Sequence, residues 1–167
     1  MNITYDFNDG NGPVPAHQHP NGGGWVSDTA TVAATAYVGP DAVVYGNAQV
    51  YGNAQVYDYA RVYSNACVYG NALVSDIAQV SGDAKVYGDA LVSKTPVRIS
   101  RSDGYDFILV PCADNVDRII AGCRSFTYEE ADEHWNRDHK MYAETTIIIE
   151  ALKKLYELQK TSKEGEM

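Results

Sequence analysis

Valine and alanine recur along the first part of the chain with a period of six residues. Valine stands at every sixth position from Val26 to Val92, twelve times without a slip. Alanine stands four residues after each of the first eleven valines, from Ala30 to Ala90. A helical period of 3.6 would scatter these valines around the axis, so the pattern excludes an α-helix. Along an extended strand an offset of four keeps Val and Ala on one side, so each unit offers one bulky and one small inward residue.

A glycine followed by asparagine or aspartate lies between the valine and the alanine in five of these units. The five pairs are Gly46-Asn47, Gly52-Asn53, Gly70-Asn71, Gly82-Asp83 and Gly88-Asp89. Gly and Asn tolerate the left-handed backbone that a sharp corner requires. Short strands that alternate with corners predict a β-solenoid, in which each repeat stacks on its neighbours.

The consensus unit Val-Tyr-Gly-Asn-Ala-Gln, seen at Val44–Gln49 and Val50–Gln55, resembles the hexapeptide repeat of left-handed parallel β-helix proteins. In that family three units form one triangular coil, so the resemblance implies about four coils over residues 26–96, with residues 18 apart stacked. Members are usually trimers, which implies a homotrimer here.

Two further segments resemble phage and bacterial hexapeptide-repeat proteins of unknown function. One is the His-x-His-x-Asn-Gly-Gly-Gly run that starts at His17, and the other runs through Gly122-Cys123 to Thr127 and Glu130. Phe126 replaces a histidine that often precedes the threonine in those proteins. The resemblance therefore implies a phage-like protein, without a known chemistry.

The 18-residue stacking also sorts the outward residues into columns. Tyrosines at 51, 69 and 87 form one column, and Leu73 and Leu91 belong to another with Tyr37 and Gln55. Tyrosine suits exposed strands in many proteins, but aromatic stripes also suit subunit interfaces. The trimers of the resembled family favour an interface made by Tyr51, Tyr69, Tyr87, Leu73 and Leu91.

Residues 1–25 are expected to form a leader that caps the first coil. His17 and His19 would point the same way on a strand and could share a metal. A glycine-rich capping loop with Trp25 as an apolar plug is the favoured interpretation, and no metal site is expected.

Residues 97–167 are expected to form a separate α+β module. Asp103-Gly104 between two apolar runs predicts a hairpin of Val97–Ser100 with Tyr105–Val110, and residues 118–123 predict a third strand. The pair Thr127 and Glu130 is a capping box that predicts a helix over about 128–138.

A second helix is expected from near Lys140 to Lys160. Its predicted apolar stripe consists of Met141, Ile148, Leu152, Leu155 and Tyr156. We expect this helix to lie on its own hairpin, with helix pairing between copies at a threefold axis as the alternative.

The charge and cysteine content narrow the classes of partner. The chain of 167 residues has a net charge of −9, which argues against binding to a nucleic-acid backbone. Three cysteines, Cys67, Cys112 and Cys123, suggest a reducing compartment. No signal peptide or membrane span is visible in the sequence, so we expect a cytoplasmic protein, in the host cytoplasm if it is phage-encoded.

The histidines argue against the enzymes of the resembled family. Hexapeptide acyltransferases use a histidine base between subunits, and a related zinc enzyme that hydrates carbon dioxide uses three histidines on neighbouring coils. All four histidines here, His17, His19, His134 and His139, lie outside the repeats. We therefore expect no cofactor and favour a protein without catalytic activity.

Three functional hypotheses remain open. The first is a non-enzymatic homotrimeric interaction protein, with a host protein as one candidate partner. The second is a trimer that holds a small anionic metabolite or nucleotide between subunits, as a sponge or inhibitor against a host defence; arginine guanidinium groups suit phosphates. Its candidate ligand residues are His17, His19, Asn21, Arg61, Arg98 and Arg101. The third is a hexapeptide-type acyltransferase that uses His17 or His19 of a neighbouring chain.

Overall fold

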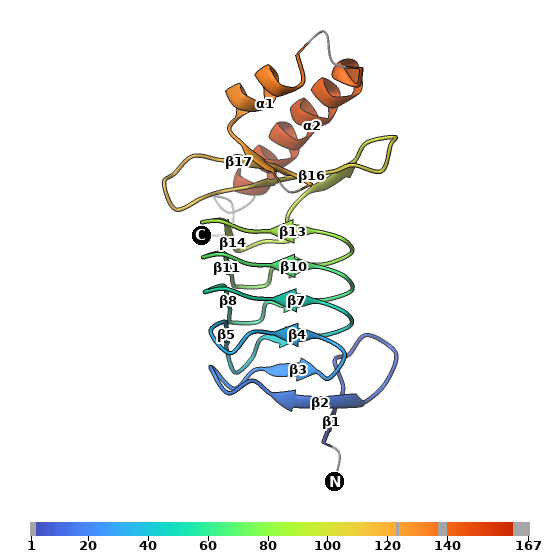
Figure 1. Cartoon of the computed structure of the whole chain (residues 1–167), viewed down its shortest axis with the longest axis vertical. Coiled ribbons are helices and arrows are strands. Elements are labelled where there is room, and N and C mark those ends of the chain that lie inside the picture. Colours follow the sequence, from blue (N-terminus) through green and yellow to red (C-terminus); the bar gives the residue numbers. More distant parts are fainter. Residues whose placement is uncertain (1–2, 123, 137–139, 162–167) are drawn as a thin grey trace. The chain divides into compact units, whose positions relative to one another are not determined.

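The chain folds into two compact units, Met1–Thr95 and Pro96–Met167. The computed structural model describes residues 3–122, 124–136 and 140–161. Figure 1 shows the stacked strands of the first unit and the sheet and helices of the second.

Unit 1 is a β-solenoid of about four turns. It has three faces, and the solenoid strands within each face are parallel. The first face consists of β3 (Trp25–Ser27), β6 (Val43–Val44), β9 (Arg61–Val62) and β12 (Gln79–Val80). The second face consists of β4 (Thr31–Val32), β7 (Gln49–Val50), β10 (Cys67–Val68) and β13 (Lys85–Val86). The third face consists of β5 (Tyr37–Val38), β8 (Gln55–Val56), β11 (Leu73–Val74) and β14 (Leu91–Val92). The predicted solenoid is thus confirmed.

The register confirms the predicted stacking of residues 18 apart. Val50 pairs with Val68, and the Tyr51 amide donates to the Val68 carbonyl at 3.0 Å. Valines from Val38 to Val86 at the repeat positions are completely buried. Val32 is only half-buried, because β4 is the last strand of its sheet among the described residues. Each inner valine therefore has the same environment as its neighbours, as the repeat predicts.

Eight corners have a left-handed backbone at the second residue after the valine, every six positions from Gly46 to Gly88. Gly52 has a φ of 70°, and a Cβ there would lie 3.0 Å from the Gly70 carbonyl oxygen. Ser64, Asp58 and Asp76 adopt positive φ at equivalent corner positions. The glycines therefore serve both the backbone angle and the close approach of successive coils.

The leader adds two strands to the first face of the solenoid. β2 (Val14–Gln18) pairs antiparallel with β3, and β1 (Thr4–Tyr5) pairs antiparallel with β2. The glycine-rich loop lies against the start of the third face, where the Gly24 amide donates to the Val38 carbonyl at 2.9 Å. The prediction that Trp25 plugs the coil is wrong. In β3 the Val26 side chain points into the coil and is fully buried, so the adjacent Trp25 points outward.

Unit 2 contains a four-stranded antiparallel sheet in chain order. Its strands are β15 (Arg98–Ser100), β16 (Asp106–Val110), β17 (Arg118–Ala121) and β18 (Arg124–Phe126). The predicted hairpin and third strand are confirmed, although Cys123 at the predicted strand's end lies outside the described residues. The sequence did not reveal β18, because three residues are too few to show a period.

Helix α1 (Tyr128–His134) begins at the predicted capping box. The Thr127 hydroxyl accepts from the Glu130 amide at 3.2 Å, and the Glu130 carboxylate accepts from the Thr127 amide at 2.8 Å. The helix ends earlier than predicted, since Trp135 leaves the helical backbone and its ring is buried against Phe107 and Phe126.

Helix α2 (Tyr142–Thr161) packs on β15 and β16 of its own sheet. Its buried residues are Thr145, Ile148, Ile149 and Leu152. The buried face is therefore rotated from the predicted stripe, and Leu155 is 41% exposed. Contact with the sheet confirms the expected packing of the helix within its own chain.

Substituting Val56 tests the inward register of the solenoid. Val56→Asp places a carboxylate in a fully buried position, at a cost of several kcal/mol, which is a large part of a typical stability of about 5–15 kcal/mol. We expect loss of the β-sheet circular dichroism signal of unit 1. Gln55→Asp in the same strand is exposed and should be tolerated; a folded Val56→Asp protein would disprove the register.

Candidate interaction surface

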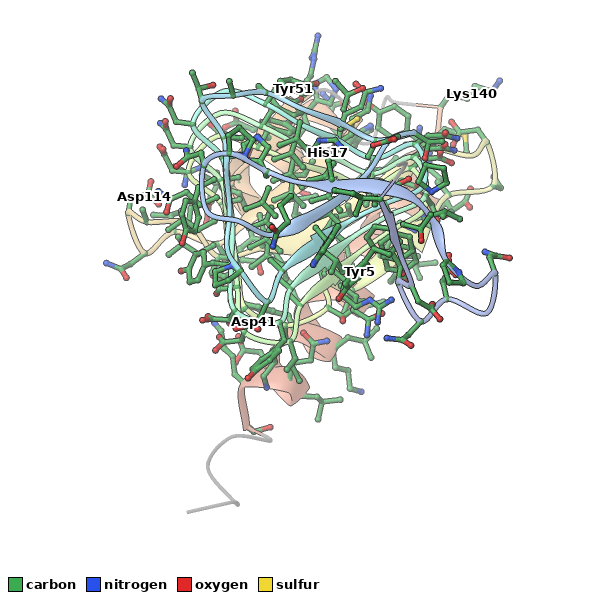
Figure 2. All side chains as sticks on the ribbon, turned by 90° about the horizontal axis from the view of Figure 1, so that it is seen from below. Tyr5, His17, Asp41, Tyr51, Asp114 and Lys140 are labelled. Carbon is green, nitrogen blue, oxygen red and sulfur yellow. The ribbon has the colours of Figure 1, made fainter. Side chains whose placement is uncertain are left out.

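Three tyrosines form a stacked column on the outside of the second face. Tyr51, Tyr69 and Tyr87, here called the exposed column, have ring centroids 5.1 and 4.9 Å apart in near-parallel planes. Tyr51 is 38% exposed, and Figure 2 shows it at the edge of the solenoid, on a different side from Asp41. Tyr69 and Tyr87 are half-buried, so Tyr51 is the ring of this column that is most open to a partner.

A second tyrosine column is covered by the leader. Tyr45 and Tyr63 stack at 5.0 Å on the first face, and Phe7 stacks on Tyr45 at 4.9 Å. Tyr5 in turn stacks on Trp25 at 4.6 Å. These rings form a small apolar cluster between the leader and the solenoid. The chain therefore buries the aromatic strip of its first face with its own residues.

Arg61 joins the leader to this covered column. Its Nη2 donates to the Phe7 carbonyl and to the Tyr45 hydroxyl, the latter at 2.9 Å, and its guanidinium lies 5.3 Å from the Tyr45 ring centroid. Burial raises the pKa of Tyr45, although the Arg61 hydrogen bond opposes this shift. Arg61 was a candidate for binding phosphate, and here it holds the leader on the solenoid.

The third face carries the predicted leucines. Leu73 and Leu91 pair in register in β11 and β14, in line with Tyr37 and Gln55. Their side chains are half-buried. This column and the exposed column flank the same corner, which is built by Gly52, Gly70 and Gly88. The five predicted interface residues therefore lie on two adjacent faces.

A further apolar site lies at the other end of the third face. Tyr59 and Ile77, here called the apolar corner, are 68% and 71% exposed, more than any other large apolar side chain among the described residues. They are 18 residues apart, and the Tyr59 amide donates to the Asp76 carbonyl at 2.9 Å. Two apolar side chains thus occupy successive coils at one corner.

The other two corners carry polar ladders at the same position of the repeat. Asn71 donates to Asp89 at 3.1 Å, and Asn65 donates to Asp83 at 3.0 Å. Sequence analysis missed the apolar corner, although the departure from Gly-Asn at Asp58-Tyr59 and Asp76-Ile77 was a usable signal. The other corners form with asparagine and aspartate at this repeat position. The fold therefore does not require apolar residues there.

The leader residues predicted to bind a ligand make local contacts. His17 in β2 is exposed and its Nδ1 lies 2.8 Å from an Asp28 carboxylate oxygen. His19 is buried, with its Nδ1 3.1 Å from the Asn21 carbonyl oxygen. The Asn21 side chain donates to the Ala36 carbonyl at 2.9 Å. The two histidines thus have separate partners. His19 and Asn21 together stabilise the glycine-rich loop.

The two predicted arginines of unit 2 also have partners. Arg98 pairs with Asp106 at 3.3 Å in an exposed position. Arg101 is buried and pairs with both oxygens of Asp103 at 3.0 and 2.8 Å, and it donates to the Thr145 hydroxyl at 2.8 Å. Arg101 therefore connects the hairpin to α2.

The described residues offer little for nucleophilic or metal chemistry. Among them no group of three His, Cys, Asp or Glu side chains could hold a metal ion. Burial raises the pKa of the Cys67 thiol, which disfavours the reactive thiolate. In the same part of the chain no helix combines the length and apolarity needed to cross a bilayer.

A cleft of about 300 Å³ lies between α1 and α2. Trp135 and Ile149 contribute to its lining, and the carboxylates of Glu129, Asp132 and Glu150 line it with Lys153. The Lys153 ammonium lies 3.9 Å from the Tyr128 ring centroid. The lining has a net negative charge, so this cleft does not suit an anionic ligand.

Comparisons with protein-family models, with curated proteins and with solved structures find no match to this chain. The function must therefore be argued from the chain's own surface.

Replacing Arg61 tests whether it holds the leader in place. Arg61→Ala removes a charged donor from the Phe7 carbonyl and the Tyr45 hydroxyl, a loss of about 1.5–3 kcal/mol for each such bond. We expect faster amide hydrogen exchange in β1 and β2 with unchanged exchange in β7 and β10. Gln79→Ala on the same face is the control. Unchanged leader protection in Arg61→Ala would contradict this role.

Proposed function

We propose that this chain is a non-enzymatic interaction protein that acts as a homotrimer. The solenoids of three copies would associate through their exposed apolar columns and so present three copies of unit 2 to a partner. We also propose that the solenoid is a left-handed parallel β-helix of the hexapeptide-repeat type. The unbroken six-residue period of valine and alanine supports this assignment.

The observation that carries the proposal is the apolar corner beside the third face. Tyr59 and Ile77 are exposed at a position where the other corners place asparagine and aspartate. Leaving such residues in water forgoes about 1.5–3 kcal/mol for each side chain that burial would supply. Leu73 and Leu91 lie at the opposite end of the third face, so apolar side chains of the kind that mark interfaces occur at both ends of this face.

The treatment of the first face supports the same conclusion. There the chain covers stacked tyrosines with Phe7 of its own leader. The exposed column lies on a different face, where Tyr51 is 38% exposed and Tyr69 and Tyr87 are half-buried. A second copy of the chain can supply that cover, and a repeated surface on each copy suits a symmetric assembly.

A second candidate function is binding of a small anionic ligand between subunits. The exposed column supports it, since stacked tyrosines offer faces to a nucleobase. The arginines expected to bind the phosphates already have partners within the chain. Arg61 donates to Phe7 and Tyr45. Arg98 pairs with Asp106, and Arg101 pairs with Asp103. The interaction protein is therefore the better supported proposal.

Native mass spectrometry of charge variants tests the trimer. The wild-type chain of 18.3 kDa should appear as a trimer at its bare sequence mass. Ile77→Glu places a carboxylate in the interface, and at about 1.4 kcal/mol per tenfold its loss of burial should weaken association by at least tenfold. We expect monomers with an unchanged circular dichroism spectrum.

Asn47→Glu is the matched control, because Asn47 occupies the same repeat position at a polar corner. It should remain a trimer. A wild-type monomer would overturn the proposal. A constant extra mass on each subunit would instead support the ligand-binding candidate.

A further inference from the structure

The leader loop between β1 and β2 contains an asparagine followed by a glycine, Asn11-Gly12. Figure 1 shows this loop near the blue end of the chain, standing out from the solenoid. Asn11 is exposed, and its side chain donates to Asp9 of the same loop at 3.0 Å. A Cβ built at Gly12, where φ is 73°, would meet no atom within 4 Å, and the Gly12 amide donates to no other described residue. The backbone of this dipeptide therefore has room to change its conformation.

The chain contains a second dipeptide of the same kind, Asn21-Gly22, in a constrained setting. The Asn21 side chain donates to the Ala36 carbonyl at 2.9 Å, and the Asn21 carbonyl accepts from the Val38 amide at 3.0 Å. A Cβ at Gly22 would lie 2.2 Å from the Val38 carbonyl oxygen. Turning the Asn21 side chain toward the next backbone nitrogen therefore breaks its anchor on the solenoid, whereas the equivalent rotation in the leader loop disturbs that loop alone.

We propose that Asn11 is a site of spontaneous deamidation in the folded protein, through a cyclic imide formed with Gly12. Asparagine is among the chemically labile residues, and no side chain at Gly12 obstructs the reaction. The Gly12 backbone nitrogen loses its proton to solvent and attacks the side-chain carbon Cγ of Asn11. The Cγ–Nδ2 bond breaks, the nitrogen leaves as ammonia, and a succinimide ring remains.

Water completes the reaction by adding to one of the two imide carbonyls, which opens the ring. The product is an aspartate or an isoaspartate, depending on which carbonyl is attacked. The net change converts one amide and one water molecule into one carboxylic acid and one ammonia molecule. No oxidant, reductant or cofactor is needed.

Deamidation changes the contacts within the leader loop. Both oxygens of Asp9 accept from Asn11, one from its backbone amide and one from its side chain, each at 3.0 Å. These hydrogen bonds lower the pKa of the Asp9 carboxyl, so that group is ionised at neutral pH. The product places a second carboxylate where the side-chain donor was, and like charges repel. Because the loop follows Phe7, which stacks on Tyr45, we expect conversion to weaken the cover on the first face.

Peptide mapping of the full chain by mass spectrometry tests the site. Folded wild-type protein is incubated in mildly alkaline buffer, which favours loss of the Gly12 amide proton, and conversion of amide to acid is followed at Asn11 and Asn21. We expect conversion at Asn11 to be at least about tenfold faster, a difference in barrier of about 1.4 kcal/mol. In denaturant the two rates should become similar, because Asn21 then loses its contacts. Equal rates in the folded protein, or faster conversion at Asn21, would overturn the proposal.

Two variants test the mechanism and its effect on the leader, and neither readout depends on the proposed trimer. Asn11→Gln keeps a neutral amide that is one methylene too long to close the same ring, so it should show no conversion at this position. Asn11→Asp reproduces one product. We expect faster amide hydrogen exchange in β1 and β2 of Asn11→Asp than of Asn11→Gln, with unchanged exchange in β7. Conversion in Asn11→Gln at the wild-type rate would overturn the mechanism, and equal exchange in the two variants would overturn the weakening of the cover.

Discussion

The structure of unit 1 depends on the stacking of equivalent residues 18 positions apart. Each short strand donates its backbone hydrogen bonds to the next coil, as between the Tyr51 amide and the Val68 carbonyl, and places one valine on the valine before it. This arrangement requires corners that return each strand to its equivalent on the neighbouring coil. From Gly46 to Gly88 a left-handed backbone makes these turns, at Gly52 as well as at Asp58 and Asp76. One insertion would displace every valine beyond it.

The same stacking turns single surface residues into columns. A residue repeated every 18 positions meets its own kind, so tyrosines form strips and asparagines form hydrogen-bonded ladders. Apolar residues that repeat at the surface therefore gather in one column. The chain covers some of these residues and leaves others exposed. Its leader covers Tyr45 through Phe7 and Arg61, whereas Tyr59 and Ile77 stay exposed. This difference in exposure is the basis of the proposed contact with another chain.

Unit 2 obeys a different principle, because no repeat fixes its core. A four-stranded sheet and two helices bury Phe107, Trp135 and Leu152 together. The buried Arg101 is satisfied by Asp103 and Thr145, which explains why a guanidinium is tolerated there. Helix α2 commits one face, with Ile148, Ile149 and Leu152, to this core.

The sequence by itself determined the solenoid, its register, the hairpin of unit 2 and the helix start at Thr127. Each of these follows from local or strictly periodic rules, namely inward Val, corner Gly-Asn and a capping box. Tertiary structure decided the roles of Arg61, Arg101 and Trp25, and which face of α2 is buried. Those outcomes depend on partners far away in sequence, such as Phe7 for Arg61 and Thr145 for Arg101. No period or local pattern encodes such contacts, so only the folded chain defines them.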